Sequence, residues 1–118
     1  MATSGFSRSR RLTHASEYDA VFKGAEFRVN SKDFLILARA TGEAPARLGT
    51  VVSKRVAGTS VSRNRIRRVI KESFRHAGSV DGMDVVVVAR PSVKDRNNSD
   101  LFAALDGAWK KLARERLN

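Results

Sequence analysis

The sequence predicts an α+β domain, a two-layer α/β sandwich in which three helices pack on a small mixed sheet of about four strands. Apolar residues recur at helical spacing in three separate segments. Two short apolar runs, residues 33–39 and 84–90, have the length of buried strands. A strand, a helix and a buried strand follow one another along residues 47–90, which indicates a parallel pair with a crossover. The general rule makes such a crossover right-handed, and we expect the helices on one face of the sheet.

The first helix is expected over residues 13–23, with Thr13 as its N-cap and Gly24 as its stop. Its apolar positions share one face, and they are Leu12, Ala15, Tyr18, Val21 and Phe22. Residues 1–11 before it contain several arginines and no acid, which predicts a flexible basic arm. Such an arm either stays disordered or becomes ordered on nucleic acid.

Three strands are expected next, at residues 26–29, 33–39 and 47–53. The turn TGEAPA at residues 41–46 predicts that the last two form a hairpin. The run DFLILAR and the four consecutive valines of residues 84–90 both indicate strands covered on two faces.

A second helix is expected from Ser60 or Val61 to His76. Its apolar positions form one face, and they are Ile66, Val69, Ile70 and Phe74. After a polar loop at residues 95–100, Asn98 or Ser99 caps a last helix. The apolar stripe of this last helix consists of Leu101, Phe102, Leu105, Trp109 and Leu112. We interpret Trp109 as a core residue.

Composition limits the possible functions of this 118-residue chain, which the size prior makes one domain, residues 1–118. The chain has 23 Lys and Arg against 12 Asp and Glu, a net charge of +11. It has no cysteine, so disulfide frameworks and zinc fingers are excluded. It also lacks the roughly 20-residue apolar run of a membrane span and the apolar stretch of a secretory signal. We therefore expect a soluble, cytoplasmic protein that binds a polyanion.

The charge is concentrated in residues 54–75, where Glu72 is the only acid. The basic residues of this segment are Lys54, Arg55, Arg63, Arg65, Arg67, Arg68, Lys71 and Arg75. Like charges one helical turn apart repel by a few tenths of a kcal/mol per pair, so the stripe indicates a phosphate partner. The alternatives are a solvated face, a membrane surface or an acidic protein.

The residue types in this segment suit RNA. Arginine forms two parallel hydrogen bonds to a phosphate, which lysine cannot do. Asn64 can donate to and accept from a base or sugar edge. Thr59, Ser60 and Ser62 either contact phosphates near the helix N-terminus or act as N-caps. A DNA-reading helix normally follows another helix across a short turn, whereas a strand and a loop precede this one.

The sequence offers no arrangement for catalysis by side chains. His14 and His76 fall in different helices, and each is expected at the surface. The aspartates are spread through turns and element ends, so they form no carboxylate cluster for two metals. The polypeptide is therefore expected to bind RNA rather than to cleave it, and an independent protein nuclease is disfavoured.

One motif resembles a known family. Ser53-Lys54-Arg55, then Gly58, then Ser62-Arg63-Asn64-Arg65-Ile66-Arg67-Arg68 resembles the signature of the bacterial ribonuclease P protein component. The order of elements fits that family over nearly the whole chain. The resemblance implies a ribosomal protein S5 domain 2-like fold with a left-handed βαβ crossover. It also implies a subunit that binds ribonuclease P RNA and the 5′ leader of precursor tRNA, and that assists endonucleolytic removal of the leader.

The resemblance further implies site residues and partners. The residues implied to bind the RNA subunit are Lys54, Arg55, Arg63, Asn64, Arg65, Arg67, Arg68 and Lys71. The residues implied to bind the leader, in a groove between the first helix and the sheet, are Tyr18, Phe22, Arg11, Phe34 and Leu37. Tyr18 and Phe22 can stack on unpaired bases, although aromatic residues at helical spacing are more often core. Leu35 and Leu37 stand where related proteins carry another aromatic residue, and core is the other interpretation of Phe34.

The implied chemistry belongs to the RNA subunit, which holds Mg²⁺ together with the substrate. No organic cofactor, membrane or obligate protein partner is expected. The alternative function is a structural rRNA-binding protein of ribosomal type, which composition alone does not separate from the first.

Overall fold

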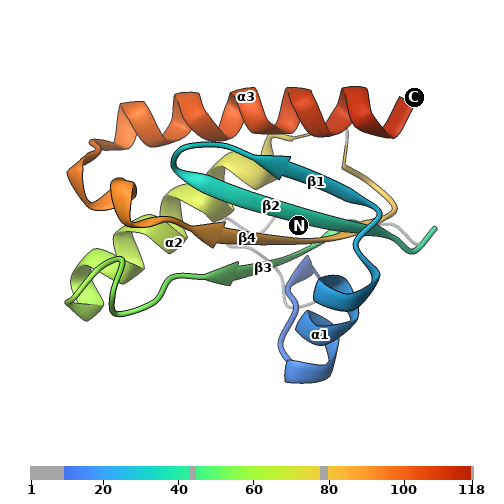
Figure 1. Ribbon diagram of the computed structural model, residues 1–118, viewed down its shortest axis with the longest axis horizontal. Helices are drawn as coiled ribbons and strands as arrows, with labels where there is room; N and C mark the ends of the chain where they lie inside the picture. The colour runs from blue at the N-terminus through green and yellow to red at the C-terminus, as the bar shows by residue number, and fades with distance from the viewer. Residues whose placement is uncertain (1–9, 43–44, 78–79, 118) are drawn as a thin grey trace, which may run out of the picture.

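The computed structural model describes residues 10–42, 45–77 and 80–117, and Figure 1 shows a mixed sheet with helices on both of its sides. The predicted α+β class, with three α-helices and four strands in the described residues, is confirmed. In chain order the elements are α1 (Ala15–Gly24), β1 (Phe27–Asn30), β2 (Phe34–Ala40), β3 (Arg47–Val51), α2 (Ser60–Arg75), β4 (Met83–Ala89), the 3₁₀-helix η2 (Pro91–Asp95) and α3 (Asn98–Leu117). The helix η2 lies in a segment for which the sequence predicted no element.

The strand order is β1-β2-β4-β3, so the predicted hairpin between β2 and β3 is wrong. Strand β4 lies between them, antiparallel to β2 and parallel to β3. The physical reason is the apolar character of β4, whose valines lose most contact with water when the strand is central. Turn residues between β2 and β3 act locally and cannot report which strand is inserted there.

The predicted parallel pair with a crossover is confirmed, because β3 and β4 are parallel and joined through α2. Figure 1 shows α2 running behind the sheet from the end of β3 to the start of β4. Because β3 and β4 are adjacent and parallel and α2 crosses on the far side of the sheet in this view, the crossover is left-handed, as the family resemblance implies. The right-handed expectation from the general rule does not hold here.

The two faces of the sheet are covered unequally. Helices α2 and α3 bury one face, which includes Phe34, Ile36, Val85 and Val87. Helix α1 packs on the other face, where Val21 meets Leu37 and Val86. The expectation that every helix lies on one face is therefore wrong, because alternating strand positions are apolar on both sides.

Helix α1 is short, so it covers only part of the sheet face on which it packs. Leu35, Val51 and Val88 pair across three neighbouring strands and are only half-buried. We call these three residues the α1-side row. The prediction that β2 and β4 are covered on both faces thus holds only in part. A strand that is covered fully on one face and partly on the other has the same apolar sequence as one covered fully on both.

Trp109 is in the core, as predicted, and is 4% exposed. Its indole N–H donates to the Ser73 hydroxyl at 2.8 Å, and its ring meets the edge of Phe74 at 5.7 Å between centroids. These contacts join α3 to α2. Phe102, placed by the sequence in the same stripe, is 37% exposed instead.

The helix ends differ in detail from the expectation. Helix α1 begins after His14 rather than Thr13, and the Glu17 carboxylate accepts from both backbone N–H groups. Asn97, not Asn98 or Ser99, accepts from the Asp100 N–H at 2.8 Å at the start of α3.

Part of the predicted flexible arm belongs to the fold. Arg11 forms a parallel bridge with Leu48 of β3, and the Leu12 N–H donates to the Leu48 carbonyl at 2.9 Å. The Arg10 guanidinium lies 5.5 Å from the Phe74 ring centroid, within cation–π range. The arm prediction is therefore wrong for residues 10 and 11, and residues 1–9 lie outside the described part.

Candidate nucleic-acid interface

Helix α2 presents its basic residues to solvent because its apolar residues are committed to the core. Thr59 caps the helix, its hydroxyl accepting from the Ser62 N–H at 3.1 Å. Ile66, Val69, Ile70 and Phe74 are all buried, as predicted. The loop before the helix and the remaining faces of α2 together carry what we call the basic ridge. Its members are Lys54 and Arg55 of the loop and Arg63, Asn64, Arg65, Arg67, Arg68 and Lys71 of α2.

Two arginines of the ridge are partly used in holding the fold. Arg63 donates to the Ala57 carbonyl at 3.0 Å and so ties the preceding loop to α2. Arg65 donates to the Asn98 side-chain oxygen at 2.7 Å and to the Arg96 carbonyl at 3.3 Å. A guanidinium has five N–H donors, so both arginines keep donors for another acceptor.

The other members of the ridge are largely free of internal partners. Arg67 donates to the neutral Asn64 amide at 3.2 Å. Lys54, Arg55 and Arg68 are exposed, and no hydrogen bond or ion pair within the described residues engages them. Glu72, the one acid of the segment, pairs with Arg75 at 2.9 Å and lies 3.3 Å from His76. The ridge therefore faces solvent without a compensating acid.

Tyr18 and Phe22 of α1 have different surroundings. The Tyr18 ring covers Gly49 so closely that a Cβ there would lie 2.6 Å from it. The Tyr18 hydroxyl accepts from the Thr50 N–H of edge strand β3 at 3.2 Å. Phe22, one turn further along, is 45% exposed and offers the larger free aromatic surface.

An ion-pair cluster fixes the orientation of α1 on the sheet. Arg47 bonds the Glu17 carboxylate of α1 at 2.7 Å and the buried Asp84 carboxylate of β4 at 2.7 Å. Residues on a helix are rotated by about 100° each, so Phe22 lies on the flank of α1 away from Glu17. Arg47 and Asp84 pair at one end of β3 and β4, and Val51 and Val88 pair four residues further along the same two strands. The flank of α1 that carries Phe22 is therefore turned towards the α1-side row.

The cluster shifts two ionisation equilibria. Hydrogen bonds from the backbone N–H groups of His14 and Thr13, with help from Arg47, lower the pKa of Glu17 from 4.5 to about 2. Hydrogen bonding to Asp84 raises the pKa of Arg47 above its usual value. Both groups are therefore charged throughout the neutral range.

Two residues predicted to bind the leader are unavailable to a ligand. Phe34 is fully buried and faces α2 and α3, on the side of the sheet opposite α1. Leu37 is 3% exposed and is covered by α1. The structure corrects both assignments, because each side chain is enclosed by protein.

A small hollow lies at the outer edge of β3. It has a volume of about 190 Å³ and is lined by Arg11, Leu12, Thr13, Tyr18, Leu48, Thr50 and Lys71. We call it the edge hollow. It brings together Arg11 and Tyr18, which the family resemblance assigns to the leader, and Lys71, which it assigns to the RNA subunit. Neither Thr13, which the sequence predicted only as an N-cap, nor Thr50 carried a signal for binding in the sequence, because tertiary pairing at β3 brings them here.

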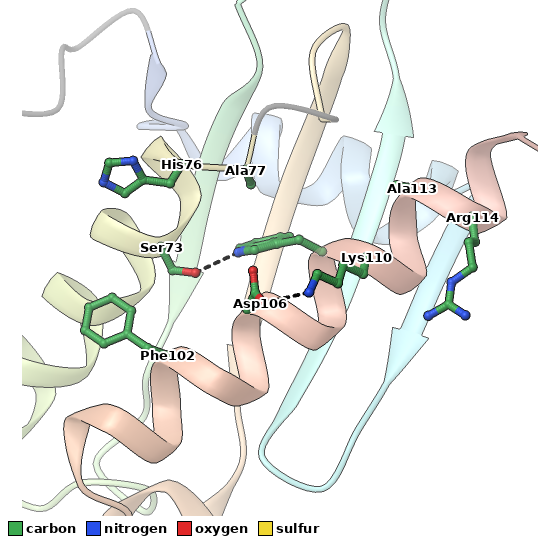
Figure 2. Close-up of a pocket in the computed structure, with 9 residues that line it drawn as sticks. Ser73, His76, Ala77, Phe102, Asp106, Lys110, Ala113 and Arg114 are labelled. Atoms are coloured by element: carbon green, nitrogen blue, oxygen red, sulfur yellow. Dashed lines mark hydrogen bonds and ion pairs between the residues drawn. The ribbon is translucent and has the colours of Figure 1, made fainter.

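A larger groove of about 800 Å³ lies between α2 and α3, on the flank of α2 away from Lys71. Figure 2 shows Ser73 of α2 and His76, the residue after α2, opposite Phe102 and Asp106 of α3. The carboxylate of Asp106 pairs with Lys110 of the same helix at 3.2 Å, so this groove, unlike the basic ridge, contains an acid next to a base.

Within the described residues, no three His, Cys, Asp or Glu side chains cluster closely enough to hold a metal ion. His14 and His76 are both exposed, as expected. None of the helices in the described ranges is long and apolar enough to cross a membrane.

Comparison with known proteins agrees with the motif. A family model described as ribonuclease P matches residues 6–113. The ribonuclease P protein component of Marinomonas sp. is 41% identical over 113 residues, which cover 95% of this chain and 86% of the relative. That of Chromohalobacter salexigens is 37% identical over 116 residues, 98% of this chain and 91% of the relative.

Solved structures share the fold. The Staphylococcus aureus RNase P protein superposes with a TM-score of 0.79 at 28% identity, over 86% of this chain and 93% of that one. The Thermotoga maritima RNase P protein gives 0.73 at 28% identity, over 88% and 96%. These matches favour the first function over a ribosomal rRNA-binding protein. The chain belongs to the ribonuclease P protein component family and is a protein subunit of ribonuclease P.

Proposed function

We propose that the basic ridge binds the RNA subunit of ribonuclease P, and that α1 with the α1-side row binds the 5′ leader of precursor tRNA. In this proposal the RNA subunit carries out the phosphodiester hydrolysis, and the polypeptide positions the substrate. Lys54, Arg55, Arg63, Asn64, Arg65, Arg67, Arg68 and Lys71 are the proposed contacts to the RNA subunit.

The observation that carries the proposal is the missing counter-charge along the ridge. Exposed arginines at neighbouring helical positions raise the free energy of the isolated protein through mutual repulsion. Folded RNA offers rows of phosphates that remove this repulsion and accept the paired N–H groups of arginine. The fixed positions of Arg63 and Arg65 support a preformed surface, since their internal hydrogen bonds already restrict their rotamers.

Leader binding is supported by Phe22 and the α1-side row. An exposed aromatic ring beside half-buried Leu35, Val51 and Val88 suits unpaired bases, which stack with about 1–3 kcal/mol each. Tyr18 contributes the part of its ring that Gly49 does not cover. The leader is single-stranded, whereas mature tRNA lacks it, so this surface distinguishes precursor from product.

Mg²⁺ is assigned to the RNA subunit and the substrate, whose phosphate oxygens are the hard ligands that this ion prefers. The described side chains supply no carboxylate cluster for it. The polypeptide acts on the reaction by binding and orientation, and by lowering the repulsion between the two RNAs.

The test is reconstitution with the RNA subunit at low Mg²⁺, comparing Phe22→Ala with Phe102→Ala. Both changes remove a half-exposed Phe from a helix, but Phe102 lies far from α1 in the groove between α2 and α3. Phe22→Ala is expected to lower affinity for precursor tRNA and to leave mature tRNA unchanged, while Phe102→Ala alters neither. Equal losses on both RNAs would refute leader binding, and precursor cleavage by the polypeptide alone would refute RNA catalysis.

A further inference from the structure

We infer that the edge hollow is a phosphate-binding site in which Arg11 and Lys71 together hold one backbone phosphate of an RNA. The inference rests on the proposed function and makes it more specific, because it identifies where the ridge and the leader surface meet. The ligand is a phosphodiester group, contributed either by the leader of precursor tRNA or by the RNA subunit.

The lining has the chemistry of an anion site. Arg11 comes from the segment paired with β3, and Lys71 comes from α2, 60 residues later in the sequence. Thr13 and Thr50 add two hydroxyl groups. Tyr18 adds a third, and because its oxygen accepts from the Thr50 N–H, its own O–H is left to donate. Two cations and three hydroxyls thus surround a space of about 190 Å³.

No acid neutralises the two cations. None of the lining residues is Asp or Glu, and within the described ranges neither Arg11 nor Lys71 has an ion-pair partner. Glu17 contacts Thr13, but its carboxylate accepts from the Thr13 and His14 N–H groups and from Arg47. Two like charges therefore share one hollow, and an anion bound between them would relieve their repulsion.

The backbone around the hollow is already held in place. The bridge from Arg11 to Leu48 and the hydrogen bond from Leu12 to Leu48 fix the N-terminal segment. Lys71 is in the fourth turn of α2, whose buried face anchors the helix to the sheet. Such a preformed site loses little conformational freedom when it binds a ligand.

The position of the edge hollow indicates which part of the bound RNA would supply the phosphate. Strand β3 is an edge strand, so its outer side joins the face that carries α1 to the face that carries α2. Tyr18 belongs to the surface proposed to bind the leader, and Lys71 belongs to the basic ridge. A phosphate held here belongs to RNA at the junction of the two proposed surfaces.

The first test uses the full chain with inorganic phosphate as the probe, followed by amide NMR shifts. We expect saturable shifts at Leu12, Thr13 and Thr50. Arg11→Gln and Lys71→Gln are each expected to weaken this binding on the order of tenfold. Lys94→Gln, which removes an exposed charge at η2, is the control and keeps the affinity unchanged. Shifts that do not saturate, or that survive both variants, overturn the inference.

The second test distinguishes the two sources of the phosphate in the reconstituted holoenzyme. If the RNA subunit supplies it, Arg11→Gln and Lys71→Gln weaken assembly; if the leader supplies it, they weaken only precursor tRNA binding. If both side chains hold one phosphate, their effects are coupled. The affinity of the double variant then falls by less than the product of the two fold-losses measured for the single variants. Independent losses overturn a joint site, while Phe22→Ala still tests leader binding and thus the proposed function separately.

Discussion

Arg65 and Arg68 are neighbours on α2 with different surroundings. Arg65 bonds to Asn98 and to the Arg96 carbonyl and so ties α2 to the start of α3, whereas Arg68 points into solvent. The motif in the sequence does not separate these two, because both are arginines in one basic run. Their internal contacts show that the motif combines a structural tie with an RNA-binding surface.

This difference predicts two distinct outcomes. Arg65→Ala is expected to lower the free energy of unfolding by about 1–2 kcal/mol, as hydrogen bonds from a charged donor are lost, and to weaken binding of the RNA subunit. Arg68→Ala is expected to weaken RNA binding with no measurable change in unfolding. Urea titration and a binding titration on each variant check this, and equal destabilisation by both would contradict the assignment.

Gly49 supplies a second prediction at the residue scale. A Cβ at this position would lie 2.6 Å from the Tyr18 ring, so Gly49→Ala must displace that ring. We expect a loss of about 1–3 kcal/mol in the free energy of unfolding and weaker binding of precursor tRNA. Gly107→Ala is the matched control, because nothing lies within 4 Å of its Cβ and α3 gains about 0.5–1 kcal/mol from alanine. Unchanged stability in Gly49→Ala would show that the ring does not rest there.

At the scale of elements, the sequence predicted the segments far better than their arrangement. Helical spacing and apolar runs are local, and they located α2, β2 and β4 to within a residue or two. The insertion of β4 between β2 and β3 depends on contacts distant in sequence, so the turn at residues 41–46 suggested a false hairpin. The burial of Phe34 beneath α2 and α3, and the half-burial of Leu35 on the side of α1, likewise depend on which helices cover each face.

The contact between α1 and the sheet predicts a dependence on acid. Because the folded-state pKa of Glu17 is lowered from 4.5 to about 2, its charge stabilises the fold above pH 4.5. This contribution is lost as the pH falls from about 4.5 towards 2. Glu17→Gln is therefore expected to be less stable than the wild type at neutral pH, with the difference shrinking over that window. Urea titrations at several pH values check this, and Asp106→Asn, at an exposed ion pair, serves as control. A difference that stays constant down to pH 2 would contradict the role of the charge.

At the scale of the whole molecule, the charge of +11 is distributed so that one surface lacks counter-ions. The basic ridge could be predicted from the sequence, because its residues lie close together along the chain, on one helix and the loop before it. The edge hollow could not, since Arg11, Thr50 and Lys71 meet only through the pairing of the N-terminal segment with β3. RNA binding by this molecule is therefore expected to combine a linear motif with a site built by the fold.

The most direct test of the account is the salt dependence of binding to the RNA subunit. Each phosphate contact adds roughly 0.7 to 0.9 to the slope of log K against log salt. Replacing Lys54, Arg55 and Arg68 together by Gln is expected to reduce that slope by about 2 to 3. Replacing Lys23, Lys32 and Lys94 together, which are exposed elsewhere, is expected to leave it nearly unchanged. An equal reduction in both triple variants, or an unchanged slope in the first, would contradict the claim that the basic ridge binds RNA phosphates.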